Sequence, residues 1–134
     1  MQALVKQKGL ESKIICDSAG TIDYHRGKPA DARMQKHARL RGYELSSISR
    51  PFENEDFELF DLIITMDDDN YLQIKWFDQR KSYTDKIRRM TDFCSTSQVS
   101  EVPDPYYGGN QGFENVLDIL EDACQGLLEY VTAK

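Results

Sequence analysis

The sequence lacks the features of several common classes of protein. It has no apolar run long enough to span a bilayer, and no signal-peptide core. Basic residues are in the minority: 17 Lys and Arg stand against 23 Asp and Glu, and the net charge is −6. This balance argues against nucleic acid or an anionic membrane as the main partner, although it allows a locally basic site for an anionic substrate.

Cysteine is scarce as well. Cys16, Cys94 and Cys124 are an odd number without a repeated spacing. In the absence of an export signal, they predict a reduced cytoplasmic chain with free thiols. No C-x-x-C or Cys/His pair has the spacing of a zinc site, so we expect neither a metal nor a cofactor.

One acidic run, Asp67-Asp68-Asp69-Asn70, raises the question of calcium. The EF-hand template fails, because Tyr71 stands where a fifth-position ligand should be and no glycine follows. The run instead predicts the start of a helix, with carboxylates near its N-terminus.

What is present suits one globular domain of 134 residues, with 40% apolar and 30% charged residues. Short apolar runs predict strands over 13–18, 62–66 and 86–90. The run over 62–66 is apolar almost throughout, which is typical of a strand covered on both faces, as in parallel sheets.

Helical patterns alternate with these strands. The first ten residues read as the last turns of a helix capped by Gly9, and a second helix begins at Pro29 and ends at Gly42. A short helix follows 53–56, another runs through 71–77, and a long amphipathic helix covers 113–131, with Cys124 as a packing residue. We expect a solvated basic face on the second helix, formed by Arg33, Lys36, Arg39 and Arg41. The alternation predicts an α/β fold with a parallel sheet.

Asp104 lies between two prolines in the stretch Val102-Pro103-Asp104-Pro105-Tyr106-Tyr107-Gly108-Gly109. Each proline fixes its own φ and pushes the preceding residue out of the helical region, so the carboxylate is rigidly held. Two aromatic rings follow, and two glycines permit a sharp reversal. This pattern favours a proton donor aimed at a ligand with a flat apolar body; the alternative is a surface turn.

Four blocks, in this order and spacing, carry a family resemblance: Cys16-Asp17-Ser18-Ala19-Gly20-Thr21, Glu55-Asp56-Phe57, Met66-Asp67 and the stretch from Glu101 to Gly108. Over nearly the whole chain, the sequence resembles the low-molecular-weight protein tyrosine phosphatases. The resemblance implies a parallel sheet with helices on both faces. It also implies metal-free hydrolysis of a phosphotyrosine protein or a small aryl phosphate through a phosphocysteine.

The resemblance implies roles for individual residues. Asp104 holds the position of the general acid and base. The substrate ring would be bound by Tyr24, Tyr106 and Tyr107. Ser18 and Asp67 match residues that support the phosphate loop, whereas Ser47 stands where many members carry a supporting histidine.

The family's nucleophilic C-x5-R-S/T loop is not found. The residues at that spacing from the three cysteines are Ile22, Ser100 and Tyr130, and none is arginine. We therefore expect residues 1–134 to form a single N-terminally truncated domain without the nucleophile and without the first, central strand of the family's sheet. Such a chain is predicted to be inactive alone, and either unstable or dependent on a partner.

Two other functions stay open. The chain could be a non-catalytic binding or regulatory short form that associates with itself, or with a full-length copy, through unpaired strand edges. It could also be a thiol enzyme like the arsenate reductases of similar fold, although Tyr106 and Tyr107 favour an aryl substrate.

Overall fold

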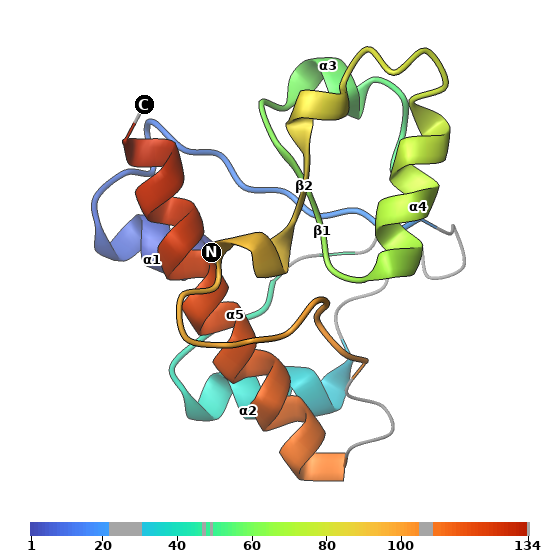
Figure 1. Cartoon of the computed structure of the whole chain (residues 1–134). Coiled ribbons are helices and arrows are strands. Elements are labelled where there is room, and N and C mark those ends of the chain that lie inside the picture. The colour runs from blue at the N-terminus through green and yellow to red at the C-terminus, as the bar shows by residue number, and fades with distance from the viewer. Residues whose placement is uncertain (22–30, 47, 49, 105–108, 134) are drawn as a thin grey trace.

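Two apolar runs pair to form the sheet of the computed structural model, which describes residues 1–21, 31–46, 48, 50–104 and 109–133 (Figure 1). Strands β1 (Ile63–Thr65) and β2 (Ile87–Arg89) are parallel, with Ile63 opposite Ile87. The helices are α1 (Gln2–Gln7), α2 (Ala32–Leu40), α3 (Asp56–Leu59), α4 (Asp68–Phe77) and α5 (Gly109–Thr132), and the 3-10 turns are η1 (Thr84–Lys86) and η2 (Met90–Phe93). Both strands lie within the predicted runs 62–66 and 86–90.

Alternate side chains of β1 point to opposite faces, and both faces are covered. Ile64 packs against the cluster built around α5, whereas Ile63 packs with Phe57, Ile74 and Ile87 from the other side. Figure 1 shows the strands between α5 on one side and α3 and α4 on the other. The prediction of an α/β fold with helices on both faces of a parallel sheet is therefore confirmed.

Helix α5 supplies the largest part of the core. Its buried residues are Phe113, Val116, Leu117, Ile119, Ala123, Leu127 and Leu128. Leu120, Cys124 and Val131 are partly buried against the same cluster. The predicted amphipathic helix is thus confirmed, and Cys124 is a packing residue as expected.

Glycines end the two N-terminal helices where the sequence places them. Gly9 and Gly42 have φ of 67° and 88°, the left-handed region that stops a helix. The start of α2 was predicted wrongly: the helix begins at Ala32, because the Asp31 side chain caps it by accepting the Arg33 N–H at 2.8 Å. Pro29 lies outside the described residues.

The predicted strand over 13–18 is wrong. Residues 11–13 form a turn and 14–19 carry no strand pairing; the first pairing is an isolated parallel bridge between Gly20 and Pro51. Ile15 is 83% exposed, so this apolar run is not covered as a strand in a sheet would be. Within the described part of the chain, β1 and β2 make up a sheet of two strands. No helix there is long and apolar enough to cross a membrane.

Candidate functional site

At the carboxyl end of β1, the chain segments that carry two of the predicted site residues meet. The Val102 N–H donates to the Met66 carbonyl at 2.7 Å. Asp67 follows Met66 directly, and Asp104 comes two residues after Val102, so both carboxylates belong to segments that meet at this edge. In open α/β sheets, ligands bind outside the carboxyl ends of the strands. Asp104 is exposed there.

Asp67 also has a local task. It is the N-cap of α4, and its Oδ1 accepts the Asn70 N–H at 2.7 Å. This confirms helix capping as the explanation of the acidic run. The next residue, Asp68, pairs with Arg89, whose guanidinium lies 4.1 Å from the centre of the Tyr71 ring. The sequence did not single out Arg89, a cation from β2 beside the start of α4.

Ser18 lies on a tethered segment. It is exposed, and its N–H donates to Oδ1 of Asp17 at 2.8 Å. Oδ2 of Asp17 accepts from Nη2 of Arg50 at 3.1 Å. Gly20 donates its N–H to the Arg50 carbonyl at 2.8 Å. Arg50, absent from the sequence prediction, therefore holds this segment with both its side chain and its backbone.

The remaining predicted residues lie outside the described part of the chain: Tyr24, Ser47, Tyr106 and Tyr107. The binding of the substrate ring by the three tyrosines, and the role of Ser47 at the position of the supporting histidine, stay predictions.

All three cysteines are free thiols, and each is half-buried. Burial raises the pKa of Cys16, and burial together with the nearby Asp122 raises the pKa of Cys94. A thiol with a raised pKa carries little thiolate at neutral pH, which makes it a poor nucleophile. Cys124 packs against the α5 cluster.

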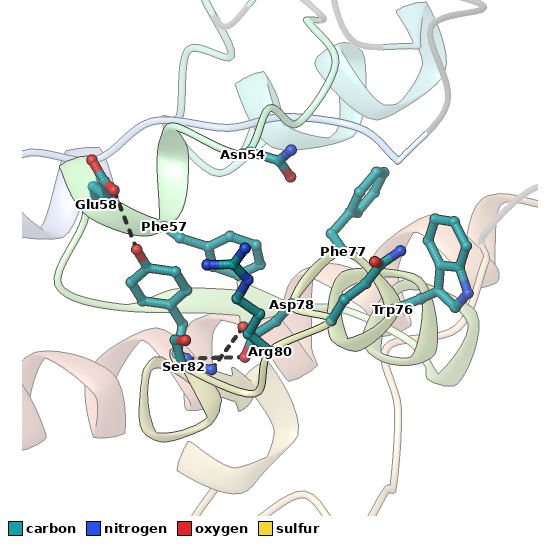
Figure 2. A pocket seen from close by; sticks show the side chains of 10 residues that line it. Asn54, Phe57, Glu58, Trp76, Phe77, Asp78, Arg80 and Ser82 are labelled. Atoms are coloured by element: carbon teal, nitrogen blue, oxygen red, sulfur yellow. Dashed lines mark hydrogen bonds between the residues drawn. The ribbon is translucent and has the colours of Figure 1, made fainter.

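A surface pocket of about 600 Å³ lies elsewhere, among α3, the C-terminal end of α4 and the loop that follows α4 (Figure 2). It is lined partly by Phe57, Trp76, Phe77 and Tyr83, and Trp76 is 68% exposed. The buried Asp78, which also lines the pocket, accepts the Ser82 and Tyr83 N–H groups at 2.9 and 3.0 Å, so its carboxylate stabilises the local fold. Of the predicted site residues that the structure describes, none lines this pocket, and among the described residues no group of three metal-ligating side chains could hold an ion.

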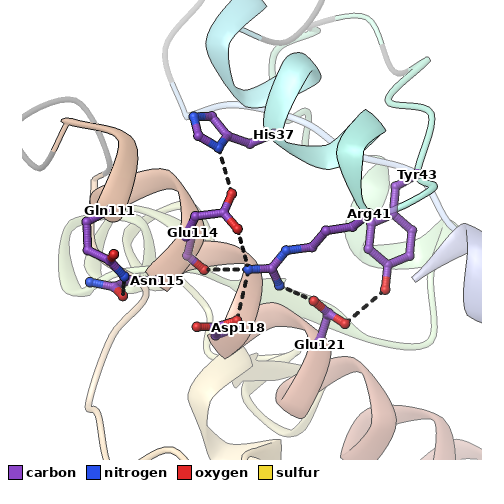
Figure 3. A network of polar contacts seen from close by, with 8 residues as sticks. All are labelled: His37, Arg41, Tyr43, Gln111, Glu114, Asn115, Asp118 and Glu121. Carbon is purple, nitrogen blue, oxygen red and sulfur yellow. Dashed lines mark hydrogen bonds and ion pairs between the residues drawn. The ribbon is translucent and has the colours of Figure 1, made fainter.

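The expected solvated face of α2 is wrong for Arg41. Its guanidinium pairs with Glu114, Asp118 and Glu121 of α5, and its side chain is only 22% exposed (Figure 3). The hydrogen bond that Arg41 donates to Glu114, with further ones to Glu121 and Asp118, raises the pKa of Arg41. His37 lies on the same side of α2, and its Nδ1 is hydrogen-bonded to Oε2 of Glu114 at 2.6 Å. This network joins two helices.

Comparison with known proteins finds a matching family and several similar proteins. The family model of the low molecular weight phosphotyrosine protein phosphatases matches residues 1–134. A putative low molecular weight protein-tyrosine-phosphatase of Synechocystis is 48% identical over 128 residues, which are 96% of this chain and 82% of that protein. YfkJ of Bacillus subtilis, a low molecular weight protein-tyrosine-phosphatase, is 36% identical over 93% of this chain and 79% of the length of YfkJ. A crystal structure of a protein tyrosine phosphatase from Entamoeba histolytica superposes with a TM-score of 0.92 at 48% identity, over 98% of this chain and 84% of that one.

Proposed function

The chain belongs to the low molecular weight phosphotyrosine protein phosphatase family, and we propose that it serves metal-free hydrolysis of phosphotyrosine or a small aryl phosphate. The single observation that carries this proposal is the hydrogen bond from Val102 to Met66, which joins the segment of Asp104 to that of Asp67 at the carboxyl end of the sheet. Three free thiols support a cytoplasmic location.

In the proposed reaction, Asp104 donates a proton to the leaving phenolate. It then removes a proton from the water that hydrolyses the phosphocysteine, because the same group must act in reverse in the second step. The substrate ring packs against Tyr24, Tyr106 and Tyr107. Ser18 and Asp67 support the loop that binds the phosphate.

The nucleophile is proposed to come from a segment other than these 134 residues. None of the three cysteines begins a C-x5-R sequence, and the pKa is raised for Cys16 and Cys94. Within the described residues β1 pairs with β2 alone, and Ile15 is 83% exposed. A further parallel strand beside β1 would pair its second edge, cover apolar surface and deliver a loop to the carboxyl end of the sheet. On this proposal the domain is incomplete, and inactive by itself.

The deciding experiment compares two proteins in p-nitrophenyl phosphate turnover. One is the 134-residue chain, and the other is an extended form that adds one strand followed by a C-x5-R-S/T loop. We expect turnover from the extended form and none above background from the shorter chain. Equal rates would show that the chemistry does not depend on the added loop.

In the extended form, Asp104→Asn should lower kcat about 10²- to 10⁴-fold, because the leaving phenolate loses its proton donor. The loss should be larger for phenyl phosphate than for p-nitrophenyl phosphate, since the less acidic phenol needs the proton more. Asp85→Asn, an exposed carboxylate of η1, is the matched control. Equal kcat values for the two variants would remove Asp104 from the mechanism.

A second candidate function is a non-catalytic module that docks on a full-length copy of the protein. It is favoured by the same second edge of β1, which has no partner strand within the described residues, and by the exposed Ile15. Light scattering of the short chain mixed with the extended form tests it: a stable 1:1 complex is expected, and separate elution would exclude it.

A further inference from the structure

Arg50 bridges two carboxylates that come from different segments. Its Nη2 and Nε donate to Oδ2 of Asp17 at 3.1 and 3.3 Å. Nη1 and Nη2 also donate to the two oxygens of Asp56 at 3.0 and 3.1 Å, so that pair is bidentate. A planar guanidinium can make both sets of hydrogen bonds at once, whereas an ammonium group lacks this fork geometry.

Asp56 is a firm anchor for this bridge. It is the first residue of α3, its side chain is 7% exposed, and one oxygen also accepts the Glu53 N–H at 2.9 Å. Burial alone would raise the pKa of Asp56, but the hydrogen bonds from Arg50 and Glu53 outweigh it and lower the pKa. The carboxylate is therefore ionised at neutral pH, and its charge is compensated chiefly by Arg50.

The backbone repeats the same connection. Gly20 donates to the Arg50 carbonyl at 2.8 Å, and Phe52 donates to the Gly20 carbonyl at 2.7 Å. The Ser18 N–H in turn donates to Asp17, the carboxylate that Arg50 holds. Segment 17–20 is thus fixed to α3 and to residues 50–52 through one side chain and two backbone hydrogen bonds.

We infer that Arg50 is a positioning residue of the phosphatase site, which orients Ser18 through the Arg50 bridge to Asp17 and Asp56. This inference rests on the proposed function, in which Ser18 supports the phosphate loop. Arg50 itself touches no reacting atom. Arg41 offers a matched comparison, because it also bridges several carboxylates, but it joins α2 to α5 (Figure 3).

The bridge itself is tested by amide hydrogen exchange in the extended form, with Arg50→Lys and Arg41→Lys as the pair of variants. Arg50→Lys should speed exchange at the Gly20 and Phe52 amides about tenfold, since local opening becomes easier. Arg41→Lys should leave these two amides unchanged. If the Arg50 variant protects both amides as well as the parent does, the bridge is overturned, whatever the protein catalyses.

The catalytic role is tested by a double-mutant cycle with Ser18→Ala, measured as kcat/KM for p-nitrophenyl phosphate. Arg50→Lys alone should cost about 10- to 100-fold, because a displaced supporting group disturbs the site. In the Ser18→Ala background, Arg50→Lys should lower kcat/KM by less than about twofold, since the two residues act as one unit. For Arg41→Lys, the fold losses in kcat/KM should be independent, so that the double variant with Ser18→Ala loses the product of the two single losses.

The outcomes separate the two claims. An extended form without turnover, or with full turnover in Ser18→Ala, contradicts the proposed site and with it the role of Arg50. Turnover that falls independently in the Arg50 and Ser18 variants contradicts only the inference about Arg50.

Discussion

At the scale of single residues, one carboxylate that accepts many hydrogen bonds is one that the sequence does not mark. Asp122 of α5 accepts three successive backbone N–H groups, from Ser95, Thr96 and Ser97, at 2.9, 3.0 and 2.7 Å. The Ser95 and Thr96 hydroxyls donate to it as well, at 3.0 Å each. These hydrogen bonds favour the ionised form, and the backbone bonds from Ser95 and Ser97 contribute most to lowering the pKa of Asp122 well below its usual range. Asp122 therefore fastens the loop after η2 to α5.

Stability should depend on pH through this carboxylate. Because the folded-state pKa of Asp122 lies below the unfolded value of 3.8, the folded state binds fewer protons near that pH. The stabilisation is complete above the unfolded pKa and is lost as the pH falls below it. In urea unfolding, Asp122→Asn should therefore be less stable than the parent at pH 7, and the difference should shrink at pH 3. An undiminished difference at pH 3 would contradict the assignment; Asp61→Asn, an exposed carboxylate, is the control.

At the scale of elements, α5 approaches η2 closely at Gly126. A Cβ placed on Gly126 would lie 1.9 Å from the Phe93 carbonyl oxygen, far inside contact distance. The absence of a side chain at this position therefore sets how near the long helix comes to the turn after β2. Phe93 and Ala123 are buried and belong to the same core cluster.

Gly126→Ala should destabilise the protein. Alanine favours a helix by about 1 kcal/mol over glycine, so the intrinsic effect would be stabilising. The clash with backbone, which cannot rotate away, should reverse the sign and lower the free energy of unfolding by about 1–3 kcal/mol. Urea unfolding measures it. Gln125→Ala, at the exposed neighbouring position, should change stability by less than about 0.5 kcal/mol, and a Gly126→Ala protein as stable as that control would refute the close approach.

At the scale of the whole molecule, the sheet is small. Within the described residues it consists of two strands of three residues each, held between the α5 cluster and the cluster of α3 and α4. Two-stranded sheets are marginal without further support. The proposed additional strand would pair with the second edge of β1, which has no partner strand among the described residues.

The short chain should therefore unfold more easily than the extended form. Each buried N–H or C=O group without a partner costs about 1–3 kcal/mol, and a few such groups rival the whole stability of a domain, about 5–15 kcal/mol. Thermal melts followed by circular dichroism should show a cooperative transition for the extended form, and a broad or low-temperature one for the 134-residue monomer. A sharp transition of the short monomer well above room temperature would contradict the proposal that the sheet lacks a strand.

The sequence by itself determined what depends on neighbours along the chain. Apolar periodicity located α5 and β1, Gly9 and Gly42 marked two helix ends, and Asp67 was expected as a helix cap. These features follow from local backbone geometry and from burial of one face, both of which leave a pattern within a few residues. The family, too, could be identified from short blocks of residues in order.

Only the tertiary structure decided the contacts between distant segments. Arg50 meets Asp17 across 33 residues, Asp122 meets Ser97 across 25, and Arg41 meets Glu121 across 80. No local pattern announces such pairs, since an arginine on a helix surface reads the same whether it faces water or another helix. The run over 13–18 shows the opposite: a local pattern is present, but the structure that it predicts does not form. Its composition is that of a strand, but a strand requires a partner for its backbone N–H and C=O groups, and the partner is decided by the fold around it.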